Sequence, residues 1–238
     1  MPEELDRGNG ATGCAHLSLL YRFSAVAALL MVALTAFDIV VYITSPPPGT
    51  VAGHIHLFQT NPLAALVALD LPLVVIQALE IPLTLALYFA LRRYSPALIA
   101  LSVGLSFVAI VAFIVTRPAL EMMQLSQQFA SAATEAQKAA ALAAGQALMA
   151  AFRGTAFHTS YLLGTAAGIV VSAVMLHSPE FGKVTAWVGL VAAISGLGLY
   201  VPLVGWPLAV LSALVLQVWN VLIARTLWRL GRCRVPAS

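Results

Sequence analysis

Six long apolar stretches constrain the fold of this 238-residue chain more than any other feature of its sequence. About 20 apolar residues cross the hydrocarbon core of a bilayer as a helix, and every stretch has that length or more. The stretches cover residues 19–43, 63–91, 96–115, 154–176, 184–204 and 206–227. Hydrophobic residues make up 61% of the chain and charged residues only 9%, which excludes a water-soluble fold. We therefore predict an all-α bundle of six transmembrane helices, built as a single integral membrane domain over residues 1–238.

The basic residues are distributed unevenly along this predicted bundle. Short loops that carry Lys and Arg stay in the cytoplasm. If the N-terminus is inside, three of the twelve basic residues lie outside, namely Arg117, Lys138 and Arg153. The other nine lie inside: Arg7, Arg22, Arg92, Arg93, Lys183, Arg225, Arg229, Arg232 and Arg234. This imbalance predicts that both termini are cytoplasmic. No basic stripe is interleaved with aromatic residues, so the expected partner is the lipid bilayer and not nucleic acid.

The long connection over residues 117–153 is rich in Ala, Gln, Met and Leu, which are good helix formers. Thr134 and Gln137 have the spacing of a capping box, which predicts a new helix from Glu135. Because no proline follows before residue 177, a single helix would measure roughly 60 Å, about twice the hydrocarbon thickness. We expect the third and fourth helices to extend outward as a helical projection.

Three acidic residues lie within the apolar stretches. Asp38 is in the first stretch, and Asp70 and Glu80 are both in the second. An ionised group in hydrocarbon costs at least about 2.5–3.5 kcal/mol, so such groups are usually paired or line a cavity. At 100° per residue, Asp70, Gln77 and Glu80 fall within a sector of about 80°, which predicts one polar stripe along the second helix.

Two interpretations of these acids remain open. They form a structural network with Arg117, Arg153, His158 or the amides Gln217 and Asn220, or they line a site or path for a small polar or cationic species. Binding or passage of such a species at an intramembrane acidic site is our leading functional hypothesis. Its predicted binding residues are Asp38, Asp70, Gln77, Glu80, Arg153 and His158.

Two further classes of function are compatible with the sequence. A non-catalytic accessory or sensor protein would use the outward projection to bind a partner. A membrane enzyme would use outer-face residues such as His54, His56 and His158 together with Asp38 or Asp70. A His-x-His pair in a loop is unspecific, and no second pair has metal-ligand spacing. No catalytic residue, metal or cofactor is therefore predicted.

Gly164 and Gly168 form a GxxxG motif in the fourth stretch, which lets another helix approach closely. The motif predicts packing within the chain, and homodimerisation is the alternative.

Two runs in the second half of the chain resemble a known family. Residues 157–164 (FHTSYLLG) and 175–190 (MLHSPEFGKVTAWVGL) are similar to bacterial multi-pass proteins of domain-of-unknown-function family 4386. The resemblance implies six membrane helices and the plasma membrane of a bacterium. It transfers no catalytic residue.

Overall fold

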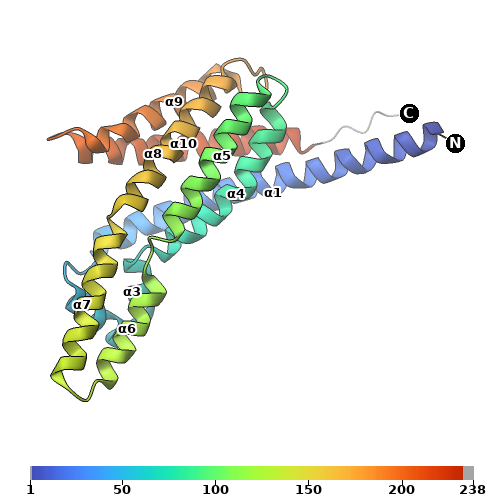
Figure 1. Ribbon diagram of the computed structural model, residues 1–238. Coiled ribbons are helices and arrows are strands. Elements are labelled where there is room, and N and C mark those ends of the chain that lie inside the picture. Colours follow the sequence, from blue (N-terminus) through green and yellow to red (C-terminus); the bar gives the residue numbers. More distant parts are fainter. Residues whose placement is uncertain (1, 233–238) are drawn as a thin grey trace. The chain divides into compact units, whose positions relative to one another are not determined.

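The computed structural model describes the backbone of residues 2–232 and, within that range, the side chains from residue 15 onward except at position 206. These residues form helices joined by short connections, with no strand among them (Figure 1). Six of the helical segments are long and apolar enough to cross a membrane. The all-α class and the six candidate spans are therefore confirmed. The predicted orientation involves Arg7, Arg234 and the two chain ends. Their side chains are not among those that the structure describes.

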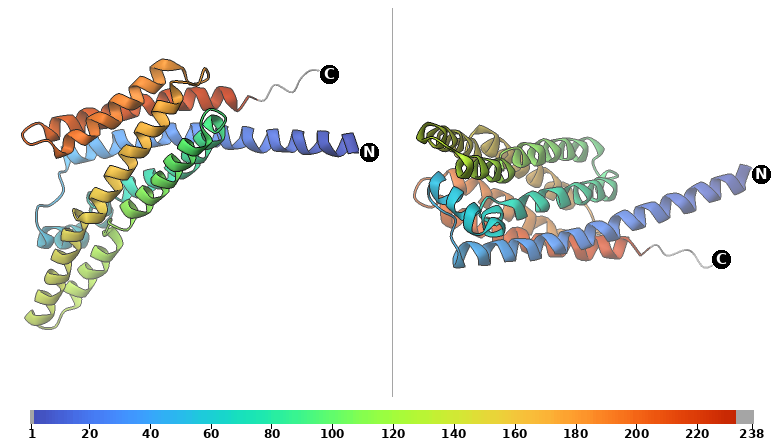
Figure 2. Two further views of the ribbon diagram at one scale, coloured as in Figure 1. Left: turned by 45° about the horizontal axis from the view of Figure 1, so that its top comes forward. Right: turned by 90° about the horizontal axis from the view of Figure 1, so that it is seen from below.

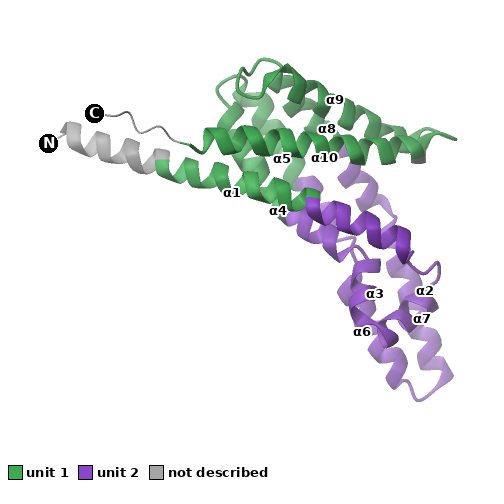
Figure 3. Cartoon of the chain, turned by 180° about the vertical axis from the view of Figure 1, so that it is seen from behind, with its two compact units in different colours: residues 1–32, 79–107, 164–238 green, residues 33–78, 108–163 purple. Residues whose placement is uncertain are grey.

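The helices follow one another closely along the chain. Their bounds are α1 Pro2–Thr44, α2 Val51–Thr60, α3 Pro62–Ala68, α4 Leu71–Leu91, α5 Pro96–Ile114, α6 Ala119–Ser131, α7 Glu135–Phe152, α8 Thr155–Met175, α9 Gly182–Leu197, the 3-10 helix η1 Gly198–Tyr200 and α10 Gly205–Leu230. They divide into two compact units (Figure 3). Unit 1 contains residues 1–32, 79–107 and 164–238, and unit 2 contains residues 33–78 and 108–163.

In unit 1, α9 and α10 form an antiparallel hairpin. The Ser212 hydroxyl donates to the Ala192 carbonyl at 2.7 Å. Nearer the turn, a Cβ built on Gly198 would overlap the side chain of Leu208. These two contacts show that α9 and α10 run in opposite directions. Glycine is needed at this close approach because any side chain would separate the helices.

Serine hydroxyls connect other helices of unit 1 through backbone carbonyls. Ser24 of α1 donates to the Pro82 carbonyl of α4 at 2.8 Å, and Ser102 of α5 donates to the Ala167 carbonyl of α8 at 3.0 Å. Such bonds are typical of membrane helices, where small polar residues allow close approach and find few competing partners. They fix the register of helices that are apolar over most of their surface.

The GxxxG motif lies on α8, also in unit 1. A Cβ built on Gly168 would lie 3.5 Å from the Cβ of Ala193 on α9, which is van der Waals distance. Gly168 therefore packs within the chain. Homodimerisation through Gly164 and Gly168 stays a prediction.

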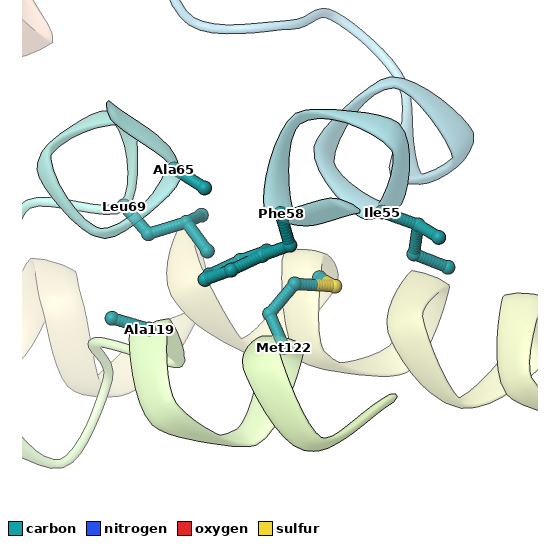
Figure 4. Close-up of a cluster of buried hydrophobic side chains, with 6 residues drawn as sticks. All are labelled: Ile55, Phe58, Ala65, Leu69, Ala119 and Met122. Carbon is teal, nitrogen blue, oxygen red and sulfur yellow. The ribbon is translucent and has the colours of Figure 1, made fainter. Parts of the chain in front are cut away.

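Unit 2 contains two short helices, of which α2 lies in a predicted loop and α3 lies at the start of the predicted stretch over residues 63–91. The Thr50 side chain accepts a hydrogen bond from the Gly53 amide and begins α2, and the Asn61 side chain accepts one from the Ala64 amide and begins α3. Both short helices pack against α6, and α2 also contacts α7. Their buried apolar side chains share one core, which Figure 4 shows between the helices. Its members are Ile55, Phe58, Ala65, Leu69, Ala119 and Met122.

The predicted helical character of residues 117–153 is confirmed in unit 2 by α6 and α7, which lie side by side (Figure 2). The capping box that begins α7 is confirmed: Thr134 accepts from the Gln137 amide at 3.3 Å, and the Gln137 side chain accepts from the Thr134 amide at 3.2 Å. A Cβ on Gly145 of α7 would overlap Val51 of α2, so these two helices touch closely.

Candidate functional site

Asp70 lies at a break between two helices. The sequence predicts one helix over residues 63–91, but α3 ends at Ala68 and α4 begins at Leu71. Pro72 explains the break, since in a continuous helix its ring would clash with the carbonyl of residue 68, whereas a proline in the first turn is tolerated. The predicted polar stripe is therefore wrong for Asp70, which does not follow the helical spacing of Gln77 and Glu80.

The backbone of Asp70 is held in an uncommon conformation. Its φ is 61°, in the left-handed region that costs a residue with a Cβ roughly 1–2 kcal/mol. Asp and Asn tolerate this region better than most residues. Such strain persists only where surrounding contacts impose it, and it clusters at functional sites. In unit 2 the same residue makes an ion pair.

Arg117 is the ionic partner of Asp70. It follows the end of α5, and its Nη1 donates to the Asp70 carboxylate. The Arg117 side chain is only 3% exposed, while that of Asp70 is 27% exposed. The Nε of Arg117 also donates to the Thr116 hydroxyl at 3.3 Å. Of the partners predicted for the acids, Arg117 is the one that forms a salt bridge with Asp70.

Three phenylalanine rings surround the Arg117 guanidinium. Its Cζ lies 4.1 Å from the ring centroid of Phe113, 4.2 Å from that of Phe152 and 5.3 Å from that of Phe157. A planar guanidinium stacks well on aromatic faces, and a desolvated cation–π contact contributes up to about 2 kcal/mol. We call Asp70, Arg117 and these three rings the caged ion pair.

One nitrogen of the caged arginine has no hydrogen-bond partner. Arg117 Nη2 is buried and unpaired among the described residues. A buried donor without an acceptor costs about 1–3 kcal/mol, and groups left so in native proteins often bind water or an ion. The cage thus contains a buried donor for which the described residues supply no acceptor.

The other predicted binding residues of unit 2 differ in their relation to this pair. Arg153 acts electrostatically on the Asp70 carboxylate, and this carboxylate acts on that of Asp38, so all three belong to the same charged cluster. Arg153 is exposed and makes no salt bridge within 4 Å in the described chain. The exposed His158 ring contacts Phe157 edge-on at 5.3 Å. Gln77 is half-buried on α4, outside the cage.

Glu80 belongs to unit 1 and is chemically separate from the caged ion pair. It is partly buried within α4, and it makes no ion pair or hydrogen bond with any residue that the structure describes. The two acids predicted to share one stripe therefore have different surroundings, one neutralised by arginine and one without a counter-charge.

The outer histidines do not form a metal centre in the described part of the chain. No three His, Cys, Asp or Glu residues there lie close enough to hold a metal ion. His54 is buried at 2% exposure, with Nδ1 unpaired, and His56 is exposed. Burial lowers the pKa of His54 from its ordinary value of 6.5, opposed by a hydrogen bond with the Pro48 backbone. His54 is therefore a neutral core residue of α2.

Sequence reasoning missed the aromatic cage and a second ionic cluster in unit 1. Glu180, in the loop after α8, accepts hydrogen bonds from Arg93, from the Tyr94 hydroxyl at 2.5 Å and from the Ser178 hydroxyl at 2.8 Å. Phe152 and Phe157 flank Arg153 in the sequence, which is a signal for a cation–aromatic site. The cation that occupies the site is nevertheless Arg117, and only the fold brings it there.

No family model matches the sequence, and no curated protein or solved structure is significantly similar to it. Membership of domain-of-unknown-function family 4386 therefore stays a prediction from the two runs quoted above.

Proposed function

We propose that this membrane protein binds a small polar species at the caged ion pair of unit 2. The observation that carries the proposal is the buried Nη2 of Arg117, which has no acceptor among the described residues. Asp70 already accepts from the same guanidinium, and its backbone is held at a φ of 61°. The charge pair is thus preformed, and the ligand completes its hydrogen bonding.

The free group is a donor, so the ligand must present an acceptor oxygen. Carboxylates, phosphates, amides and water satisfy this condition. Arg forms bidentate hydrogen bonds with carboxylates and phosphates in particular. A bare cation fits less well because Arg117 already neutralises Asp70. The predicted ligand is therefore a small polar or anionic species, and no longer a small polar or cationic one.

A thermal-shift series on the detergent-purified protein tests the proposal. The probes are acetate, inorganic phosphate, acetamide and sodium ion, since a ligand of the folded state raises the unfolding midpoint by mass action. The variant Asp70→Asn/Arg117→Met removes the site without leaving an unpaired charge. The control Glu135→Gln/Lys138→Met removes an exposed ion pair of α7.

An oxygen-bearing probe should raise the midpoint of the wild type and of the control, and leave the site variant unchanged. Equal shifts in all three proteins, or a response to sodium alone, would contradict an arginine-centred site.

The proposed setting is the plasma membrane of a bacterium, with both termini and the Arg92–Arg93 loop inside and residues 117–153 outside. The charge distribution in the sequence supports this orientation. Single cysteines at Ala133 and Arg232, both exposed, test it in a background with Cys14 and Cys233 replaced by serine. An impermeant thiol reagent should label Ala133→Cys in intact cells and Arg232→Cys only after lysis. Equal labelling would refute the orientation.

A second candidate is an accessory or sensor protein that binds a partner through α6 and α7. The observation in its favour is that α2, α3, α6 and α7 form a packed body with its own apolar core. A photo-crosslinking amino acid at the exposed Ala143 of α7 should then give one discrete adduct in cells. Absence of any adduct at this position would remove the candidate.

A further inference from the structure

Glu80 lies near the middle of a helix long enough to cross a membrane. It is the tenth of the 21 residues of α4. At 1.5 Å per residue the helix extends about 14 Å before it and about 17 Å after it. The hydrocarbon core is about 30 Å thick, so the carboxyl group sits close to its midplane when α4 spans the bilayer.

No charge of the described chain compensates this carboxyl group. No cation or hydrogen-bond donor pairs with it, and no charged residue acts on it electrostatically. The nearest cations along α4, Arg92 and Arg93, follow by 12 and 13 residues, or about 18–20 Å of helix. Glu80 is therefore the one acid of the second predicted span without a compensating cation in the described residues.

The helix packed against α4 at this level also supplies no charge. Ser24 of α1 donates to the Pro82 carbonyl, two residues beyond Glu80. The ionisable neighbours of Ser24 on α1 face elsewhere: Arg22 donates to the Gly231 carbonyl, and Tyr21 interacts electrostatically with Arg92 and Arg93.

We infer that Glu80 is a proton-binding site, held in its neutral acid form within the bilayer. An isolated carboxylate in an apolar medium neutralises by taking up a proton, because the charged form costs far more than the neutral one. The protonated acid gains an O–H donor.

The two acids of the second predicted span therefore differ in protonation state. Asp70 stays ionised against Arg117, whereas Glu80 exchanges a proton when water or a cation reaches it. This inference concerns a different residue and a different ligand from the caged ion pair. It can therefore be tested independently of the proposed function.

Infrared difference spectroscopy of the full chain in lipid vesicles tests the inference directly. The spectrum of the wild type minus that of Glu80→Gln isolates the Glu80 carboxyl group, whether or not reagents can reach it. At neutral pH the difference should contain the carbonyl stretch of a protonated acid, and raising the pH should replace it by carboxylate bands. The matched difference for Asp70→Asn should contain carboxylate bands at neutral pH.

Carboxylate bands of Glu80 at neutral pH, converted to the acid only under acidic conditions, would overturn the inference. Circular dichroism of Glu80→Gln serves as the folding control, since glutamine has nearly the shape of the neutral acid. If that variant does not fold, Glu80→Met replaces it, because an apolar residue of similar length suits a span without counter-charge.

Discussion

The two units of this protein differ in how deeply their ion pairs are buried. Unit 2 buries a full charge pair, with Arg117 surrounded by three phenylalanine rings and bound to Asp70. In unit 1 the ion pair Arg93–Glu180 lies in the connections between helices, with the Arg93 side chain 59% exposed, and the helices themselves are joined by glycine contacts and by neutral bonds from serine hydroxyls to carbonyls. A buried charge pair is costly when broken, whereas a hydroxyl–carbonyl bond is worth little individually. The same substitution type should therefore have very different effects in the two units.

The largest difference is expected between Asp70→Asn and Glu80→Gln. Removing the Asp70 charge leaves Arg117 buried and unpaired, which should lower the unfolding free energy by about 3–5 kcal/mol. Glu80 has no partner to lose, so Glu80→Gln should change stability by less than about 1 kcal/mol. Chemical unfolding in mixed micelles measures both. Similar losses for the two variants would show that Glu80 has a charged partner or that Asp70 lacks one.

The next effect belongs to the glycine contacts of unit 1. A Cβ at Gly189 of α9 would overlap Ser172 Oγ and Trp219 Nε1, so Gly189→Ala should cost about 1–3 kcal/mol. Gly104→Ala on α5 is the matched control because nothing lies within 4 Å of its Cβ position, and the helix propensity of alanine should stabilise it by up to about 1 kcal/mol. Thermal unfolding of both variants compares them. A harmless alanine at Gly189 would argue against close packing of α9.

A smaller effect should follow pH through His54 of unit 2. Burial lowers the pKa of His54 in the folded state, so below about pH 6.5 the unfolded chain binds more protons than the folded one. The unfolding free energy should therefore fall as the pH drops below that value, by at most about 1.4 kcal/mol per pH unit for this group. His54→Gln should flatten that part of the stability–pH curve, whereas the exposed His56→Gln should not. An unchanged curve in His54→Gln would rule out the buried neutral histidine.

The smallest effect is expected for a single serine bridge. Ser102→Ala removes the bond from α5 to the Ala167 carbonyl of α8, and comparable bonds in membrane proteins average about 0.6 kcal/mol. The exposed Ser131→Ala, which loses only bonds within α6, is the control. A loss of several kcal/mol for Ser102→Ala would mean that unit 1 depends on polar interactions as strongly as unit 2.

Hydropathy and capping signals predicted much of this fold. The six apolar runs gave the candidate spans, and Thr134 with Gln137 gave the start of α7. These features are local, since they depend on residues within one helix or one turn. The short helix α2 was not predicted, because a run of ten residues is too short to distinguish a helix from a loop. The helix α3 was predicted as the start of a longer helix, and its separation from α4 was not.

The candidate site was predicted only in part, for a physical reason. Asp70 stood out as an acid in an apolar stretch, but the break that reorients it depends on Pro72 and on contacts with Arg117, 47 residues away. The cage around Arg117 joins residues from α5, α7 and α8, and no local pattern links them. The sequence thus indicates which charged residues need a partner, whereas tertiary packing determines which residue that partner is.

A double-mutant cycle of Asp70→Asn and Arg117→Met tests the central claim, the caged ion pair, most directly. Each single variant leaves one buried charge unpaired, so each should be strongly destabilised. The double variant leaves none and should recover much of the loss, with a coupling free energy of up to about 3 kcal/mol. A double variant whose loss equals the sum of the two single losses would contradict the account, because the two residues would then act independently.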